Sequence, residues 1–152
     1  MSIPGERILA MDLGTRRIGL AVSDELGWTA QGLPTMERIG PKKDIARLRG
    51  IVAEYQVRKL IVGLPRNMDG SLGPQANLTL EFIEQLKNKF KLDVIPWDER
   101  LTTQAAERIL IEAEMSRAKR RKKVDQVAAV LILQGYLDSR QSLIQTVGPS
   151  EA

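Results

Sequence analysis

The chain has 152 residues, of which 43% are hydrophobic and 28% charged, enough for one soluble domain with a sizeable core. It contains no cysteine and no histidine, which excludes disulfides, thiolate nucleophiles, zinc–thiolate sites and histidine general bases. Any hydrolytic chemistry must therefore depend on carboxylate, Lys, Tyr, Ser or Thr side chains. The formal charge of +4 is mildly basic and by itself indicates no particular partner. Carboxylates are hard oxygen ligands, which favours Mg²⁺ or Mn²⁺ over zinc.

The expected location and domain organisation rest on features that are not found in the sequence: an apolar span, a signal pattern, repeats and linkers. No apolar run approaches the length that spans a bilayer, and the start MSIPGERILAMD has no secretory signal pattern. We therefore expect a cytoplasmic protein without a membrane partner. Without repeats or linkers, we expect a single domain over residues 1–139 and a flexible tail over residues 140–152.

Apolar runs of strand length predict a sheet. Arg7–Asp12 is apolar on both faces, as in a buried central strand. Arg17–Ser23 follows after a short turn, so these two strands are expected to form a hairpin. Further strands are predicted at Gln31–Glu37, Lys59–Leu64 and Val94–Asp98, the last at a sheet edge because Pro96 cannot donate to a ladder.

Helical spacing of apolar residues separates and follows these strands. Because helix-linked strands pair in parallel while a hairpin is antiparallel, we expect a mixed α/β sheet with helices on both faces. The predicted helices cover Asp44–Tyr55, Pro74 to about Phe90, a segment after Thr102 or Thr103 with Ala106, Ile109, Leu110 and Ala113 on its apolar face, and about Lys122 to Asp138.

Asp12 is the first candidate site residue. It ends an otherwise apolar strand on the face of Ile8 and Ala10, where a charge needs a partner or a metal ion. Taken alone, Asp12 fits an acceptor for the Gly14 turn better than a metal ligand.

Glu99 is the second candidate. Taken alone, it fits an acidic pair in a surface loop, bridged to Arg100. Strand alternation nevertheless predicts two faces, with Ile95, Trp97 and Glu99 on one and Pro96 and Asp98 on the other.

Asp125 is the third candidate. Its neighbours three, four and seven residues on are Ala128, Ala129 and Ile132, so it interrupts an apolar helical stripe. An acid favoured by the helix dipole is the alternative.

Ligands of parallel α/β sheets bind beyond the carboxyl ends of strands, where these three carboxylates would converge. Two cations roughly 4 Å apart would neutralise them and stabilise the attacking and leaving oxygens of a phosphodiester.

Several basic and polar residues are candidates for nucleic-acid binding. The block RAKRRKK at residues 117–123 carries six cations and no acid, and it is either a solvated surface or a phosphate-binding patch. Arg16, Arg17 and Arg100 flank the acids and either contact phosphates or pair with Asp24, Glu25 or Glu99. The loop Arg66–Gly73 enters a helix N-terminus and forms either an anion site or a plain turn. The candidates are Arg16, Arg17, Arg66, Asn67, Ser71, Arg100, Lys119, Arg120, Arg121, Lys122 and Lys123.

Four segments around these residues resemble the YqgF (also called RuvX) family of pre-16S rRNA nucleases. They are RILAMDLGTRRIGLAVSD, IVGLPRNMDGSLGP, PWDERLTT and RRKKVDQVAAVLIL, which occur in order between residues 7 and 133. The resemblance implies an RNase H-like fold with strand order 3-2-1-4-5 and an antiparallel strand 2. It also implies an acidic triad at Asp12, Glu99 and Asp125, with Asp98 as an alternative to Glu99.

The resulting hypothesis is in-line phosphodiester hydrolysis in the 5′ region of pre-16S rRNA. Asp12 would bridge two Mg²⁺ or Mn²⁺ ions, while Glu99 and Asp125 would each hold one. The expected partners are pre-16S rRNA within a pre-ribosomal particle and, alternatively, branched DNA, with the protein as a monomer or weak dimer. A Holliday junction resolvase-like DNA endonuclease and a non-catalytic RNA-binding assembly factor remain alternatives. A nucleotide-binding module of the actin/sugar-kinase type is disfavoured, because its Asp-x-Gly-Thr half occurs only once.

Overall fold

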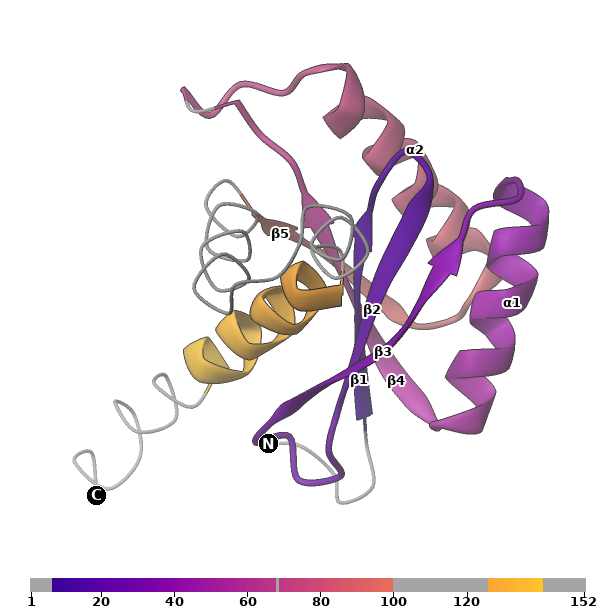
Figure 1. The fold of residues 1–152 in the computed structure, drawn as a ribbon, viewed down its shortest axis with the longest axis vertical. Helices are drawn as coiled ribbons and strands as arrows, with labels where there is room; N and C mark the ends of the chain where they lie inside the picture. The colour runs from indigo at the N-terminus through magenta and orange to yellow at the C-terminus, as the bar shows by residue number, and fades with distance from the viewer. Residues whose placement is uncertain (1–6, 68, 100–125, 141–152) are drawn as a thin grey trace, which may run out of the picture.

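The computed structural model describes residues 7–67, 69–99 and 126–140. Five strands form one sheet in the order β3-β2-β1-β4-β5 (Figure 1). β2 runs antiparallel to both of its neighbours, whereas β1, β4 and β5 are parallel, so the predicted topology is confirmed. The elements are β1 Arg7–Leu13, β2 Arg17–Ser23, β3 Ala30–Glu37, α1 Pro41–Glu54, β4 Val57–Leu64, α2 Pro74–Lys89, β5 Asp93–Asp98 and a C-terminal helix at residues 126–140.

The strand positions follow from the hydrophobic pattern. β1 and β4 lie at the centre, which is why their sequences are apolar on both faces. β5 is an edge strand, as Pro96 predicts, and Pro96 is aligned with Val62 of β4. The parallel strands direct their carboxyl ends to one edge of the sheet, where Asp12 and Glu99 lie.

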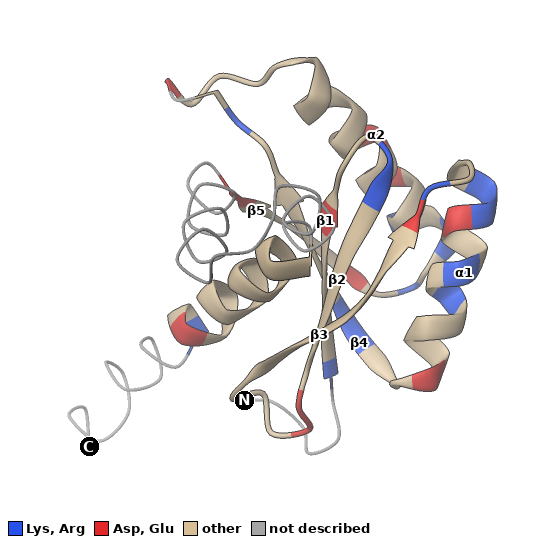
Figure 2. Cartoon of the chain, in the orientation of Figure 1, with Lys and Arg blue, Asp and Glu red and all other residues tan. Residues whose placement is uncertain are grey.

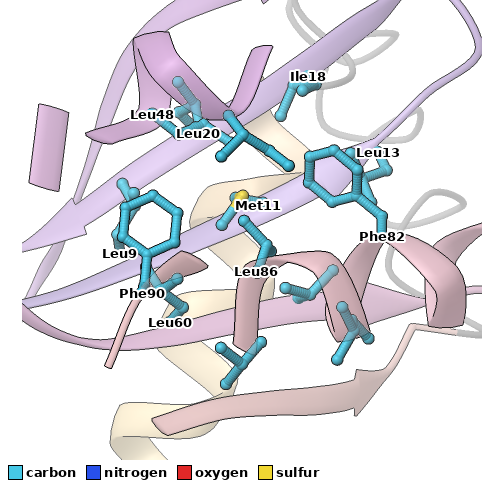
Figure 3. Close-up of a cluster of buried hydrophobic side chains, with 14 of the residues drawn as sticks. Leu9, Met11, Leu13, Ile18, Leu20, Leu48, Leu60, Phe82, Leu86 and Phe90 are labelled. Carbon is cyan, nitrogen blue, oxygen red and sulfur yellow. The ribbon is translucent and has the colours of Figure 1, made fainter. Parts of the chain in front are cut away.

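Helices cover both faces of the sheet (Figure 1). α1 and α2 pack on one face, where Leu48, Phe82 and Leu86 meet Met11 and Leu60 in a buried cluster (Figure 3). The C-terminal helix packs on the other face. Its cluster there contains Ile8, Ala10, Ala21, Ile61, Ala129, Ile132, Leu133, Tyr136 and Leu137.

The start of one helix differs from the sequence prediction. α1 begins at Pro41, three residues before the predicted start, because proline suits the first turn although it adds nothing to the apolar stripe. The helix predicted after Thr102 or Thr103 lies outside the described residues. Within the described ranges, no helix combines the length and hydrophobicity that a bilayer span requires.

Candidate functional site

Asp12 lies at the carboxyl end of β1 with only 7% of its surface exposed. The antiparallel register pairs it with Gly19 of β2, and directly paired residues project from the same face. One step beyond the β1–β4 pair Met11–Val62, the next residue of β4 is Gly63. Glycines therefore flank Asp12 on both neighbouring strands, and neither strand places a side chain of its own beside the carboxylate.

Glu99 directly follows β5 and is 8% exposed. Its main-chain N–H donates to the Leu64 carbonyl at 3.3 Å, which continues the pairing of β4 with β5. Its carboxylate lies on the backbone of Gly63, where a Cβ atom would collide with Oε2 and lie 2.6 Å from Cδ1 of Ile132. Gly63 therefore leaves the space that the Glu99 carboxylate occupies on the strand next to Asp12.

Asp98 and Glu99 point in different directions. The Asp98 side chain is 39% exposed, and its Oδ2 lies 3.9 Å from Nε of Arg66. Ile95 and Trp97 pack against the cluster under the C-terminal helix, on the face to which alternation also assigns Glu99. The predicted two faces of β5 are confirmed, and Glu99 is the carboxylate on the same face as Asp12.

The C-terminal helix is bound to edge strand β3 by two glutamines. The Gln126 amide donates to the Leu33 carbonyl at 2.8 Å, and its side chain packs on Gly32, where a Cβ atom would lie 2.9 Å from Cγ. Eight residues on, Gln134 accepts from the Ala30 N–H at 3.2 Å. These bonds satisfy main-chain groups of an edge strand and hold the helix across the sheet.

The apolar stripe predicted for this helix is confirmed. Ala128, Ala129 and Ile132 are completely buried. Asp125, which precedes the first described residue of the helix, lies outside the described residues. Arg100 and Lys119–Lys123 also lie outside them.

Arg16 and Arg17 follow the turn after β1, Arg16 exposed and Arg17 half-buried. Of the acids proposed to pair with them, Glu25 binds Arg7 at 3.2 Å. The Asp24 carboxylate accepts from the main-chain N–H groups of Trp28 and Thr29. Within the described part of the chain, Arg16 has no carboxylate within 4.0 Å, so none of the described acids pairs with its guanidinium.

The loop after β4 uses most of its donors internally. The Ser71 N–H and hydroxyl both donate to Asp69, at 2.9 and 2.6 Å, and the Asn67 amide donates to the Ser71 hydroxyl at 2.9 Å. The bonds from Ser71 lower the pKa of the Asp69 carboxyl below its ordinary 3.8. Arg66 donates to the Gly70 carbonyl at 3.1 Å. This geometry fits a self-contained turn, which is one of the two interpretations of the loop sequence.

Within residues 7–67, 69–99 and 126–140, no three acidic side chains cluster closely enough to hold a metal ion. The described site is a carboxylate pair, Asp12 and Glu99, on either side of β4. β1 and β5 lie two strand spacings apart, roughly 10 Å, and Glu99 covers part of that distance by lying on Gly63.

The sequence analysis missed Gly63 as the residue that makes room for Glu99. An isolated glycine inside the buried run KLIVGL was the available signal, because such a glycine often marks a close approach.

Comparison with known proteins identifies the family of the chain. The profile of the RuvX family, described as "Holliday junction resolvase", matches residues 6–139. The chain belongs to the RuvX family. A Clostridium tetani relative, named "Putative pre-16S rRNA nuclease", is 54% identical over 133 residues, which cover 88% of this chain and 96% of the relative. A Thermoanaerobacter pseudethanolicus relative of the same name is 53% identical over 137 residues, covering 90% and 99%.

Solved structures similar to this RuvX-family chain share its fold at low sequence identity. Thermus thermophilus RuvC, solved with a Holliday junction substrate, has a TM-score of 0.54 and 17% identity, covering 89% of this chain and 96% of RuvC. Fowlpox virus resolvase, solved with Holliday junction DNA, has a TM-score of 0.56 and 14% identity, covering 88% and 98%. These neighbours and the 3-2-1-4-5 sheet establish the RNase H-like fold.

Proposed function

We propose that this RuvX-family nuclease hydrolyses phosphodiester bonds near the 5′ end of pre-16S rRNA with divalent cations bound by Asp12, Glu99 and Asp125. The observation that carries the proposal is the pair of buried carboxylates at the carboxyl edge of β1 and after β5. Relatives that are more than half identical and bear the pre-16S rRNA nuclease name support the substrate.

The donor set fits Mg²⁺ or Mn²⁺. Two carboxylates, each less than a tenth exposed, face the same side of the sheet with only a glycine of β4 between them. Carboxylate oxygens are the hard ligands that Mg²⁺ and Mn²⁺ prefer. The chain has no histidine or cysteine to select zinc. When bound, Mg²⁺ or Mn²⁺ supplies Lewis acidity toward the phosphate and lowers the pKa of a water molecule.

The protein's own contribution is orientation and charge. The backbone of Gly63 and the side chain of Ile132 restrict the Glu99 carboxylate, which keeps its oxygens on the Asp12 side of the sheet. Arg16, exposed in the turn after Asp12, is available to bind a phosphate next to the scissile one. We assign Asp125 to the same cluster because it is next in sequence to the first described residue of the helix whose Ile132 packs over Gly63.

Exchanging Asp12 for Asn tests this function. We expect the Asp12→Asn protein to lose Mg²⁺- or Mn²⁺-dependent cleavage of a precursor 16S rRNA fragment while it still binds that RNA. Asp98→Asn is the matched control, because it removes an adjacent acid that points away from the site, and it should cleave nearly as well as the parent protein. Cleavage by a contaminant-free Asp12→Asn preparation would contradict the carboxylate assignment.

A four-way DNA junction is the second substrate to compare, because the family profile carries the resolvase description. We expect the RNA fragment to be cut faster than the junction under equal metal concentrations. Faster cutting of the junction, at symmetric positions on opposing strands, would favour the DNA endonuclease instead and would require a two-fold dimer.

A further inference from the structure

A groove of about 390 Å³ lies between α1 and α2, on the side of the sheet opposite the C-terminal helix (Figure 1). Ile45 and Ala46 contribute apolar surface to it. Its polar lining consists of cations and amides, with no carboxylate among the described lining residues. The lining residues are Pro41, Lys42, Ile45, Ala46, Arg49, Gln85, Asn88 and Lys89.

The three cations of the groove have no acidic partner among the described residues. Among the described residues, no carboxylate lies within 4.0 Å of Lys42, Arg49 or Lys89, although basic residues elsewhere form such ion pairs. The one acid in the first turn of α1, Asp44, is completely buried and faces Arg38 and Arg47. The other charged residues of α1 are Lys42, Lys43, Arg47, Arg49 and Glu54, so basic residues predominate along this helix (Figure 2). The groove therefore carries three positive charges that no described carboxylate pairs with.

Arg49 is held in place within the groove. Its Nη2 donates to the Lys89 carbonyl at 3.4 Å, and its guanidinium carbon lies 5.7 Å from the centre of the Phe90 ring. A guanidinium fixed over an aromatic ring loses less conformational entropy when it binds an anion. This arrangement distinguishes the groove from a set of freely moving surface lysines.

The residue types that line the groove indicate which class of partner it binds. Interfaces between proteins are anchored by aromatic side chains and are depleted in lysine at their centres, whereas this groove exposes lysines and no aromatic face. Cations and side-chain amides are the groups that contact phosphate and sugar oxygens. We propose that the α1–α2 groove binds the sugar-phosphate backbone of RNA, as a second contact surface separate from the carboxylates.

This inference rests on the proposed function in taking RNA as the substrate. The sheet lies between the groove and the carboxylates, so a short RNA at the carboxylates cannot reach the groove. The groove therefore contributes to the affinity for long, structured RNA and not to the chemical step.

The test compares two triple variants with the same change in charge. Lys42→Gln/Arg49→Gln/Lys89→Gln removes the groove cations, whereas Lys43→Gln/Arg58→Gln/Lys91→Gln removes three exposed cations that do not line it. A fluorescent hairpin RNA from the 5′ flank of precursor 16S rRNA is titrated without divalent cations at several salt concentrations. The groove variant should lose about tenfold or more in affinity, and its salt slope should flatten by about 2. The control variant should change by less than about threefold.

Each outcome has a separate meaning. If the Arg49→Gln substitution lowers the melting temperature, the Lys42→Gln/Lys89→Gln variant repeats the test with the Phe90 contact intact. If the groove variant binds RNA as tightly as the control variant, the proposal is wrong. An acidic protein surface would then be the partner to test for the groove. Cleavage of a short RNA by the groove variant should match the parent. Absence of metal-dependent cleavage in the parent would instead contradict the proposed function, without bearing on the groove.

Discussion

At the scale of single residues, the position of Glu99 depends on Gly63. A methyl group at Gly63 would collide with the Glu99 carboxylate and with Ile132, so Gly63→Ala must displace one of them. We expect Gly63→Ala to slow cleavage roughly 100-fold, because a catalytic group displaced by about 1 Å loses its productive alignment. The measurement is single-turnover cleavage of the precursor RNA fragment.

Gly50→Ala is the matched control for this change. Gly50 lies in α1, and a Cβ atom there would meet no atom within 4 Å. Alanine should stabilise the helix by about 1 kcal/mol and leave cleavage unchanged. A folded Gly63→Ala protein with the parent's rate would mean that the position of Glu99 does not limit the reaction.

At the scale of elements, Arg38 joins the turn after β1 to the start of α1. Its Nη1 donates to the Gly14 carbonyl at 2.8 Å, and its Nε lies 3.7 Å from the Asp44 carboxylate, which is completely buried. Asp44 in turn accepts from the Ile39 N–H at 2.9 Å. The turn that follows Asp12 is thereby attached to the helix layer on the opposite face of the sheet.

Arg38→Gln should lower the free energy of unfolding by about 2–3 kcal/mol, because it leaves the buried Asp44 carboxylate without its least exposed cation. Urea unfolding measures this loss. Arg47→Gln is the comparison, because Arg47 lies 3.8 Å from the same carboxylate but is 40% exposed, and its loss should cost about 1 kcal/mol or less. Equal losses for the two variants would show that Arg38 has no special part in holding Asp44.

At the scale of the whole molecule, two hydrophobic clusters stabilise the fold. The clusters lie on opposite faces of the sheet, so the protein should remain folded when divalent cations are removed. Bound cations should nevertheless stabilise it, because they bind the carboxylates of the folded site and not the unfolded chain.

We expect Mn²⁺ at 100 times its dissociation constant to stabilise the protein by about 2.7 kcal/mol. For a domain of this size, that corresponds to a rise in melting temperature of roughly 5–10 °C. Differential scanning fluorimetry with and without Mn²⁺ measures the shift. The Asp12→Asn protein should show little of it, and an equal shift in that variant would locate the stabilising ion elsewhere.

The sequence by itself determined the sheet and most of its boundaries, because apolar runs and proline positions act locally. β2 was predicted at its observed bounds, and Pro96 and Pro74 marked the edge strand and the start of α2. The alternation in β5 also assigned Asp98 and Glu99 to opposite faces. The start of α1 was missed by three residues, because periodicity registers only at the first apolar side chain, Ile45.

Only the tertiary structure decided which residues meet. The Glu99 carboxylate lies on Gly63, 36 positions earlier in the chain, and Gln126 binds the main chain of β3, 93 positions away. The α1–α2 groove likewise brings Lys42 and Arg49 of α1 together with Lys89 of α2, which lies at least 40 positions later in the chain. Such contacts depend on strand register and on how closely a helix approaches the sheet, and neither is encoded by a local pattern.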